Sequence, residues 1–119
     1  MNEKLYAFFL VFLGGGVGAS LRFGASMLFA SFNASFWLST LLVNGLGTLF
    51  YFVSLKVPSA QGEMMSFFVR FGLLGALTTF STLSYEVASA FRSGQHVTAG
   101  LIFGLNILTG VLIAIGMLR

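Results

Sequence analysis

Four long apolar runs constrain the fold of this chain more than any other feature. They cover residues 5–30, 36–55, 67–91 and 97–118, and the second and fourth contain no charged residue. A helix needs about 20 apolar residues to cross a hydrocarbon core of about 30 Å. The runs are too long and too continuous for β-strands, and they lack an alternation of period two. The sequence therefore predicts an all-α integral membrane protein with four transmembrane helices.

The composition excludes a soluble protein. Hydrophobic residues make up 57% of the 119 residues and charged residues 8%, whereas soluble domains carry about 25% charged residues. A soluble chain of this length could not hide so much apolar surface, because small domains bury only about two-thirds of the surface of the unfolded chain. The connections between the runs are short, so we expect one domain over residues 1–119. The chain has no cysteine, which excludes a disulfide framework and a thiolate metal site.

The basic residues give a weak signal of orientation. An even number of spans places both termini on one side, together with the connection between the second and third runs. That side would hold Lys4, Lys56, Arg70 and Arg119, and the other side Arg92 and Arg22. Four basic residues against two are a small bias under the positive-inside rule, so cytoplasmic termini are favoured and insertion in both orientations is still permitted. We relate the net charge of +3 to orientation and expect no nucleic-acid partner.

The third run is polar for a membrane helix between Gly72 and Glu86. Gly72 and Gly75 weaken the helix, and five hydroxyl side chains can replace lost backbone hydrogen bonds. These are Thr78, Thr79, Ser81, Thr82 and Ser84. Broken helices occur at membrane depth only where they are buried in protein or line a cavity, and their free carbonyl and N–H groups suit a cation and an anion respectively. We predict a broken third helix that lines an ion pathway. The alternative is a kinked packing helix whose hydroxyls bond to the preceding turn.

Arg22 and Asn44 are polar residues inside otherwise apolar runs. A guanidinium at the bilayer centre costs about 3 kcal/mol or more, so it faces protein or water. Arg22 is either a cation at a pore mouth that attracts anions or a side chain that reaches the lipid headgroups. Asn44 either donates an N–H to a passing anion or forms an interhelical hydrogen bond, which contributes about 0.6 kcal/mol.

Phe80, Asn106 and Thr109 extend this set of candidates. Phe80 lies among hydroxyl residues, and the positive edge of its ring would attract an anion without a cation. Asn106 and Thr109 are three residues apart and share a helix face, where they either complete a polar track or bond across helices. G-x-x-x-G pairs at residues 14–18 and 100–104 are typical of close helix packing in lipid.

Three stretches carry a resemblance to a known family. They are GGGVGASLR at residues 14–22, TLLVN at residues 40–44 and GALTTFST at residues 75–82. Together they closely resemble the Fluc (CrcB) fluoride channels, and the resemblance covers the whole length, with four spans in the same order. The third stretch is specific, whereas the glycine run alone would be a weak signal.

The resemblance implies a dual-topology dimer of antiparallel subunits with two narrow fluoride pores and a central structural sodium ion (Na+). It implies that Arg22 is the vestibule arginine and that the backbone carbonyls of Gly75 and Thr78 hold the sodium with their counterparts in the second subunit. The pore would be lined by Asn44, Phe80, Ser81 and Thr82, with Asn106 and Thr109 as further candidates. The family has a second phenylalanine where this chain has Leu83. An isobutyl group has no positive ring edge, so one side of the fluoride site would lose a contact.

The leading hypothesis is a passive, fluoride-selective channel that exports fluoride and confers fluoride resistance, in the cell membrane of a prokaryote. Its partners would be fluoride, the lipid bilayer and a second subunit. A subunit of a heterodimeric fluoride channel is one alternative, because Leu83 and the weak charge bias leave it open. Others are a non-transporting assembly subunit and a small proton-coupled multidrug exporter, for which Glu86 is the only candidate carboxylate. We expect no enzyme, since the sequence offers no nucleophile, base and acid set and no metal cluster.

Overall fold

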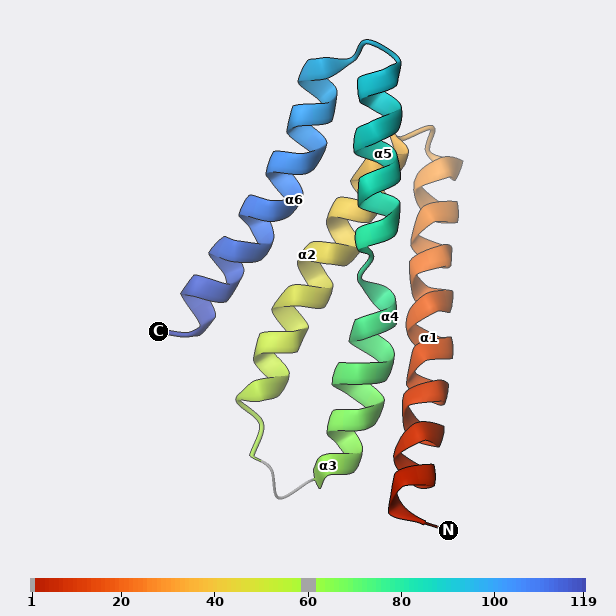
Figure 1. The fold of residues 1–119 in the computed structure, drawn as a ribbon, viewed down its shortest axis with the longest axis vertical. Helices are drawn as coiled ribbons and strands as arrows, with labels where there is room; N and C mark the ends of the chain where they lie inside the picture. The colour runs from red at the N-terminus through yellow and green to blue at the C-terminus, as the bar shows by residue number, and fades with distance from the viewer. Residues whose placement is uncertain (1, 59–61) are drawn as a thin grey trace.

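The computed structural model describes residues 2–58 and 62–119 and is helical throughout, apart from the connections (Figure 1). Within these described residues, four helices are long and apolar enough to cross a membrane: α1 (Glu3–Ser31), α2 (Phe36–Leu55), a composite third span (Ser66–Arg92) and α6 (His96–Met117). Their ends differ from the predicted runs by no more than two residues. The prediction of an all-α protein with four membrane-spanning helices is therefore confirmed.

The third span consists of several pieces. The short α3 (Gly62–Met65) precedes the π-helix η2 (Ser66–Leu74), which continues into α4 (Gly75–Leu77) and, after an interruption, α5 (Phe80–Arg92). The interruption is extended backbone at Thr78 (φ −77°, ψ 151°) and Thr79 (φ −147°, ψ 120°). The predicted break of the third helix is thus confirmed. Of the predicted connection at residues 56–66, positions 59–61 lie outside the described residues.

Glycines let α1 pack directly against the backbone of the third span. A Cβ atom added at Gly14 would collide with the carbonyl oxygen of Phe68, and one added at Gly18 with that of Leu73. Gly72 faces the same contact, since its added Cβ would lie 2.9 Å from the Cα of Gly14. The predicted packing role of the first G-x-x-x-G pair is confirmed. Gly72 also permits close approach to α1, a role that the sequence did not predict, and it lies six residues before the break.

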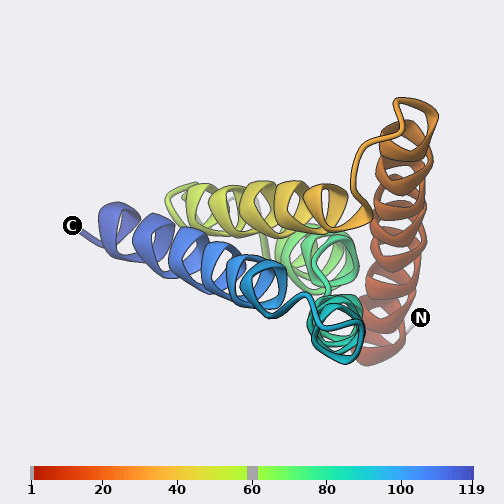
Figure 2. The ribbon, with the colours of Figure 1, turned by 90° about the horizontal axis from the view of Figure 1, so that it is seen from above.

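The second G-x-x-x-G pair shows no such close approach among the described residues. A Cβ added at Gly100 or Gly104 would meet no described atom within 4 Å. Seen from above, α1 stands on one side of the third span, and α2 and α6 extend away on the other side (Figure 2). Both termini point toward the end of the molecule where α2 leads to α3, and the other two connections lie at the opposite end (Figure 1). This is the arrangement expected for an even number of spans.

Candidate ion pathway at the helix break

The side chain of Asn44 on α2 binds both backbone polar groups of Thr79 at the break, its N–H and its carbonyl. The N–H of Thr79 donates to Asn44 Oδ1 at 2.8 Å, and Asn44 Nδ2 donates to the carbonyl oxygen of Thr79 at 3.2 Å. The same nitrogen also donates to Oδ1 of Asn106 on α6 at 2.9 Å. Both N–H groups of the Asn44 carboxamide are therefore used within the subunit. Of the two roles that the sequence left open for Asn44, the structure contains the interhelical hydrogen bonds.

The break removes the helical partners of two backbone carbonyls. In a continuous α-helix the carbonyls of Gly75 and Thr78 would accept from the N–H groups of residues 79 and 82. Instead, the N–H of Thr79 binds Asn44, and the N–H of Thr82 donates to Oγ1 of Thr79 at 3.2 Å. Unwound carbonyls of this kind coordinate sodium in membrane proteins with broken helices. The chemistry of Gly75 and Thr78 therefore fits the sodium ligands that the resemblance implies.

Arg22 is directed at the same region. Its Nε donates to the carbonyl oxygen of Ala76 at 3.0 Å, and its side chain is half-buried. Ala76 lies in α4, whose carbonyl end precedes the break, and a cation at the carbonyl end of a helical segment is favourable. Arg22 thus anchors α1 to the break, whereas its role in drawing anions to a pore stays a prediction.

A groove of about 270 Å³ opens beside the break. It is lined by Asn44, Thr48, Thr78, Thr79, Phe80, Leu83, Asn106 and Ile107. Five of the predicted site residues thus come together from α2, α5, α6 and the break. Phe80 and Leu83 differ in their exposure, which is 75% for Phe80 and 4% for Leu83. Phe80 therefore presents its ring on the surface of the subunit, while Leu83 packs largely inside it.

The other predicted residues do not line this groove. Ser81 and Thr82 gather around the hydroxyl of Thr79, which donates to Thr82 Oγ1 at 3.1 Å and lies 3.4 Å from Ser81 Oγ. Thr109 packs α6 on α2, where a Cβ added at Gly45 would lie 3.5 Å from its methyl group. The hydroxyl cluster is therefore centred on Thr79, a residue that the sequence marked only as part of a polar stretch.

Thr40 and Glu86 form a polar pair that sequence reasoning did not identify. The hydroxyl of Thr40 donates to Glu86 Oε1 at 2.7 Å, and Thr40 is 4% exposed. The second carboxylate oxygen, Oε2, is buried and has no hydrogen-bond partner within the described residues. The sequence signals this pair only in that both residues are polar and lie in apolar runs. Because 46 positions separate them, the sequence does not show that they meet. Thr48, which donates to the carbonyl of Asn44 at 2.8 Å, is a further groove residue that was missed.

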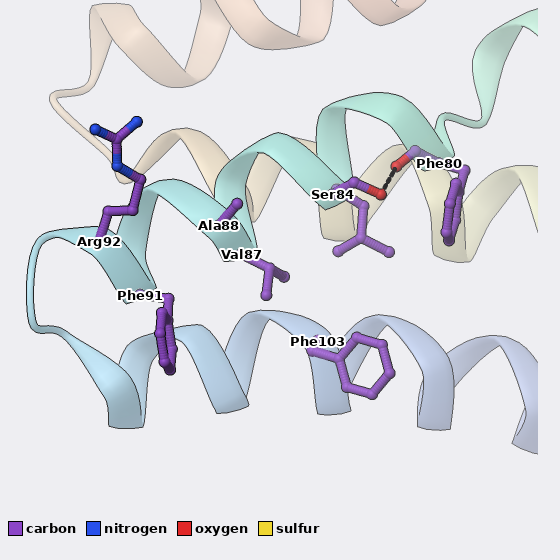
Figure 3. A pocket seen from close by; sticks show the side chains of 8 residues that line it. Phe80, Ser84, Val87, Ala88, Phe91, Arg92 and Phe103 are labelled. Carbon is purple, nitrogen blue, oxygen red and sulfur yellow. Dashed lines mark hydrogen bonds between the residues drawn. The ribbon is translucent and has the colours of Figure 1, made fainter.

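A second groove of about 430 Å³ runs between α5 and α6 from Phe80 to Arg92. Figure 3 shows the rings of Phe80, Phe91 and Phe103 turned toward this space, while the guanidinium of Arg92 points away from α6. The hydroxyl of Ser84 donates to the carbonyl of Phe80 at 2.9 Å and so keeps to its own helix. Phe80 and Leu83 line both grooves. Phe80 and Leu83 therefore lie where the groove along α5 meets the groove at the break.

The chain was compared with known proteins. A family model described as "CrcB-like protein, Camphor Resistance (CrcB)" matches residues 9–117. A protein of Idiomarina loihiensis is 39% identical over 91% of this chain and 86% of its own length, and one of Hyphomonas neptunium is 40% identical over 87% and 86%. A protein of Thermus thermophilus is 39% identical over 74% and 73%. All three bear the name "Fluoride-specific ion channel FluC".

These matches confirm the resemblance that the three sequence stretches carry. They extend over all four helices, and the relatives are named as ion channels, which also supports the expectation that the chain is not an enzyme. The four apolar helices and the bacterial channel relatives identify a multi-pass membrane protein. On this agreement between sequence, fold and relatives, the chain belongs to the CrcB family.

Proposed function

We propose that this chain forms a passive, fluoride-selective channel. The observation that carries the proposal is the name of its relatives, fluoride-specific ion channel, at about 39% identity over most of the chain. The broken third span supports it, because non-helical backbone at membrane depth is tolerated where it lines a cavity or is buried in protein. A pore narrow enough to replace the hydration shell of fluoride by protein donors would exclude chloride by size.

The fluoride path passes the helix break. Phe80 offers the positive edge of an exposed ring, and the hydroxyls of Ser81 and Thr82 lie next to it along α5. Leu83 borders the same grooves without a ring, and Asn44 and Asn106 border the groove at the break. Thr109 would join the path further along α6. Arg22 binds the carbonyl of Ala76, two residues before the break, and its charge would raise the local concentration of anions.

A structural sodium ion would lie at the break. The carbonyls of Gly75 and Thr78 have lost their helical donors, and Gly75 is exposed on the subunit. Bound sodium would supply positive charge that holds these carbonyls in place. Two oxygen atoms are too few to replace the hydration shell of a cation, so further carbonyls from a second subunit would complete the site.

A second subunit would pack across the face that carries the break. The exposed ring of Phe80 and the open glycine pair at residues 100–104 are features of a surface that another helix can approach closely. We propose an antiparallel, dual-topology dimer with two pores, because the small charge bias permits insertion both ways. In the cell membrane of a prokaryote this channel would export fluoride that enters as the neutral acid, and would thereby confer fluoride resistance.

The decisive experiment is fluoride efflux from proteoliposomes that contain only the purified chain. A fluoride electrode records efflux after the membrane potential is collapsed, and the same vesicles loaded with chloride serve as the control. The proposal expects rapid fluoride efflux and little chloride efflux. Efflux that appears only after co-reconstitution with a homologous subunit that has phenylalanine at the position of Leu83 would indicate a heterodimer. The absence of fluoride efflux in both preparations would reject the proposal.

A proton-coupled exporter is the second candidate, and one observation favours it. Glu86 lies inside the third span, and one of its carboxylate oxygens is buried without a partner within the described residues. A carboxylate of this kind can exchange protons for a cationic substrate. The Glu86→Gln variant separates the two functions. It should abolish proton-driven uptake of a cationic dye in an exporter, whereas a fluoride channel should retain much of its efflux.

A further inference from the structure

A chain of hydrogen bonds connects α6, α2 and the helix break. Asn106 Nδ2 donates to the carbonyl oxygen of Ile102 at 2.9 Å, one turn earlier on α6. Asn106 Oδ1 accepts from Asn44 Nδ2 at 2.9 Å, and the Asn44 carboxamide then binds both the N–H and the carbonyl of Thr79. Four residues from three parts of the sequence are thereby linked in one continuous series.

The carbonyl of Ile102 sets the orientation of the side chains in this series of hydrogen bonds. The carbonyl of Ile102 can only accept, so it holds the NH2 group of Asn106 and turns the oxygen of Asn106 toward Asn44. That oxygen can only accept as well, so it selects the NH2 side of the Asn44 carboxamide. If Asn44 were rotated by half a turn, its oxygen would face the carbonyl of Thr79 and its NH2 would face the N–H of Thr79. Both bonds to the break would then be lost.

The surroundings make this orientation costly to lose. Asn106 is 7% exposed, and Asn44 is half-buried beside it. A buried polar group left without a partner costs more than the net gain of a typical hydrogen bond. The bonds also act on the break itself, because Asn44 takes the N–H of Thr79 that would otherwise close the helix onto Gly75. The orientation of Asn44 therefore decides whether the break stays open.

We propose that Asn106 is a positioning residue, which orients Asn44 so that Asn44 holds the break of the third span open. Asn106 then acts on ion flow through Asn44 and Thr79, and not by contact with the ion. The effect on flux rests on the proposed function as a fluoride channel. The effect on the break does not, since it follows from the hydrogen bonds alone.

A double-mutant cycle tests the proposal with Asn44→Ala, Asn106→Ala and the double variant. Thermal unfolding of the purified protein in detergent and fluoride efflux from proteoliposomes are measured for each. Because the second residue acts through the first, the double variant should unfold at about the temperature of Asn44→Ala alone. Asn106→Ala removes one hydrogen bond from Asn44 and should lower fluoride efflux by about tenfold, the factor that matches one lost hydrogen bond to a buried group. Asn44→Ala removes three hydrogen bonds and should lower efflux at least as much, and the double variant should lose no more than Asn44→Ala.

Two matched variants separate positioning from general loss of packing. Ile102→Ala removes a buried side chain from the same helix, and its effect should add to that of Asn44→Ala. Asn106→Asp in its neutral form retains an acceptor for Asn44 and an O–H for the carbonyl of Ile102, so it should restore efflux and unfolding temperature. Should Asn106→Ala not fold, Asn106→Ser takes its place in the cycle, since its hydroxyl is too short to reach Asn44.

Additive effects of Asn44→Ala and Asn106→Ala, on both unfolding temperature and efflux, would overturn the proposal. So would a loss of efflux in Asn106→Ala at an unchanged unfolding temperature, which would place Asn106 in direct contact with the ion. Absence of fluoride efflux in the unmodified chain would reject the proposed function instead. In that case the cycle in unfolding temperature alone decides whether Asn106 positions Asn44.

Discussion

Leu83 stands where the resemblance to the fluoride channels implies a second phenylalanine of the proposed pore. It is nearly buried but lines both grooves together with Phe80. Leu83→Phe places a second ring edge beside Phe80. One aromatic contact contributes about 0.5–1.5 kcal/mol, so we expect fluoride efflux to increase several-fold. Efflux from proteoliposomes measures the change. Leu83→Met, which adds no ring, should lack the gain. Equal efflux in Leu83→Phe and the unmodified chain would show that this position has no role in the pore.

Thr79 caps the N-terminus of α5, directly after the break. Its hydroxyl accepts from the N–H of Thr82, as the N-cap of α5. Thr79→Val keeps the shape and removes the acceptor, so we expect a loss of about 1 kcal/mol in the free energy of unfolding. Chemical denaturation in detergent measures it, and Thr79→Ser should retain most of the stability. The control is Ser84→Ala, whose hydroxyl only bonds to its own helix. A loss of equal size in Thr79→Val and Ser84→Ala would contradict the capping role.

At this scale the sequence predicts which residue types gather at the site but not how they pair. An amide in an apolar run such as Asn44 needs hydrogen-bond partners, and the structure provides them. Its partners, however, lie 35 and 62 positions away, at Thr79 and Asn106, and depend on how α2 and α6 meet the third span. The pairing of Thr40 with Glu86 was missed for the same reason. Hydrogen-bond pairs between helices require the relative rotation of the helices, which hydrophobic patterns determine only coarsely.

Among the elements, the contact between α1 and the third span depends on three glycines, Gly14, Gly18 and Gly72. At Gly14 an added methyl group would collide with the backbone of η2, which cannot move aside as a side chain can. We expect Gly14→Ala to lower the free energy of unfolding by about 1–3 kcal/mol. Gly15→Ala is the matched control, because nothing described lies within 4 Å of its added Cβ. That variant should be neutral or stabilised by up to about 1 kcal/mol. Similar unfolding curves for both variants would contradict the packing.

The elements themselves were predictable to different degrees. The four spans follow from run length and absence of charge, and the break follows from hydroxyl residues where lipid would favour aliphatic ones. The π-helical form of η2 was not predicted, since a period of 3.6 residues does not distinguish it from an α-helix over nine residues. Gly72 was assigned to the break because glycine weakens helices. Its contact with α1 was not predicted, because that contact depends on Gly14, a partner in another helix.

As a whole molecule, the single subunit leaves its break and its second glycine pair uncovered. Phe80 is exposed, a Cβ added at Gly100 or Gly104 would meet no described atom within 4 Å, and the carbonyls of Gly75 and Thr78 lack helical donors. These features share one physical requirement, which is that polar backbone at membrane depth must find partners. A second subunit and a cation between the two breaks would satisfy it together. Assembly and cation binding should therefore be coupled.

Replacement of sodium tests this coupling. When sodium is exchanged for N-methylglucamine at constant ionic strength, the carbonyls at the break would lose the proposed cation, and each unpaired carbonyl would cost about 1–3 kcal/mol. We expect a lower unfolding temperature and more monomer in size-exclusion chromatography with light scattering, and both should return when sodium is restored. The loss should exceed that caused by exchange of one large organic cation for another, which is the control for ionic composition. An unfolding temperature and a molar mass that do not change without sodium would show that the break is satisfied by protein groups alone.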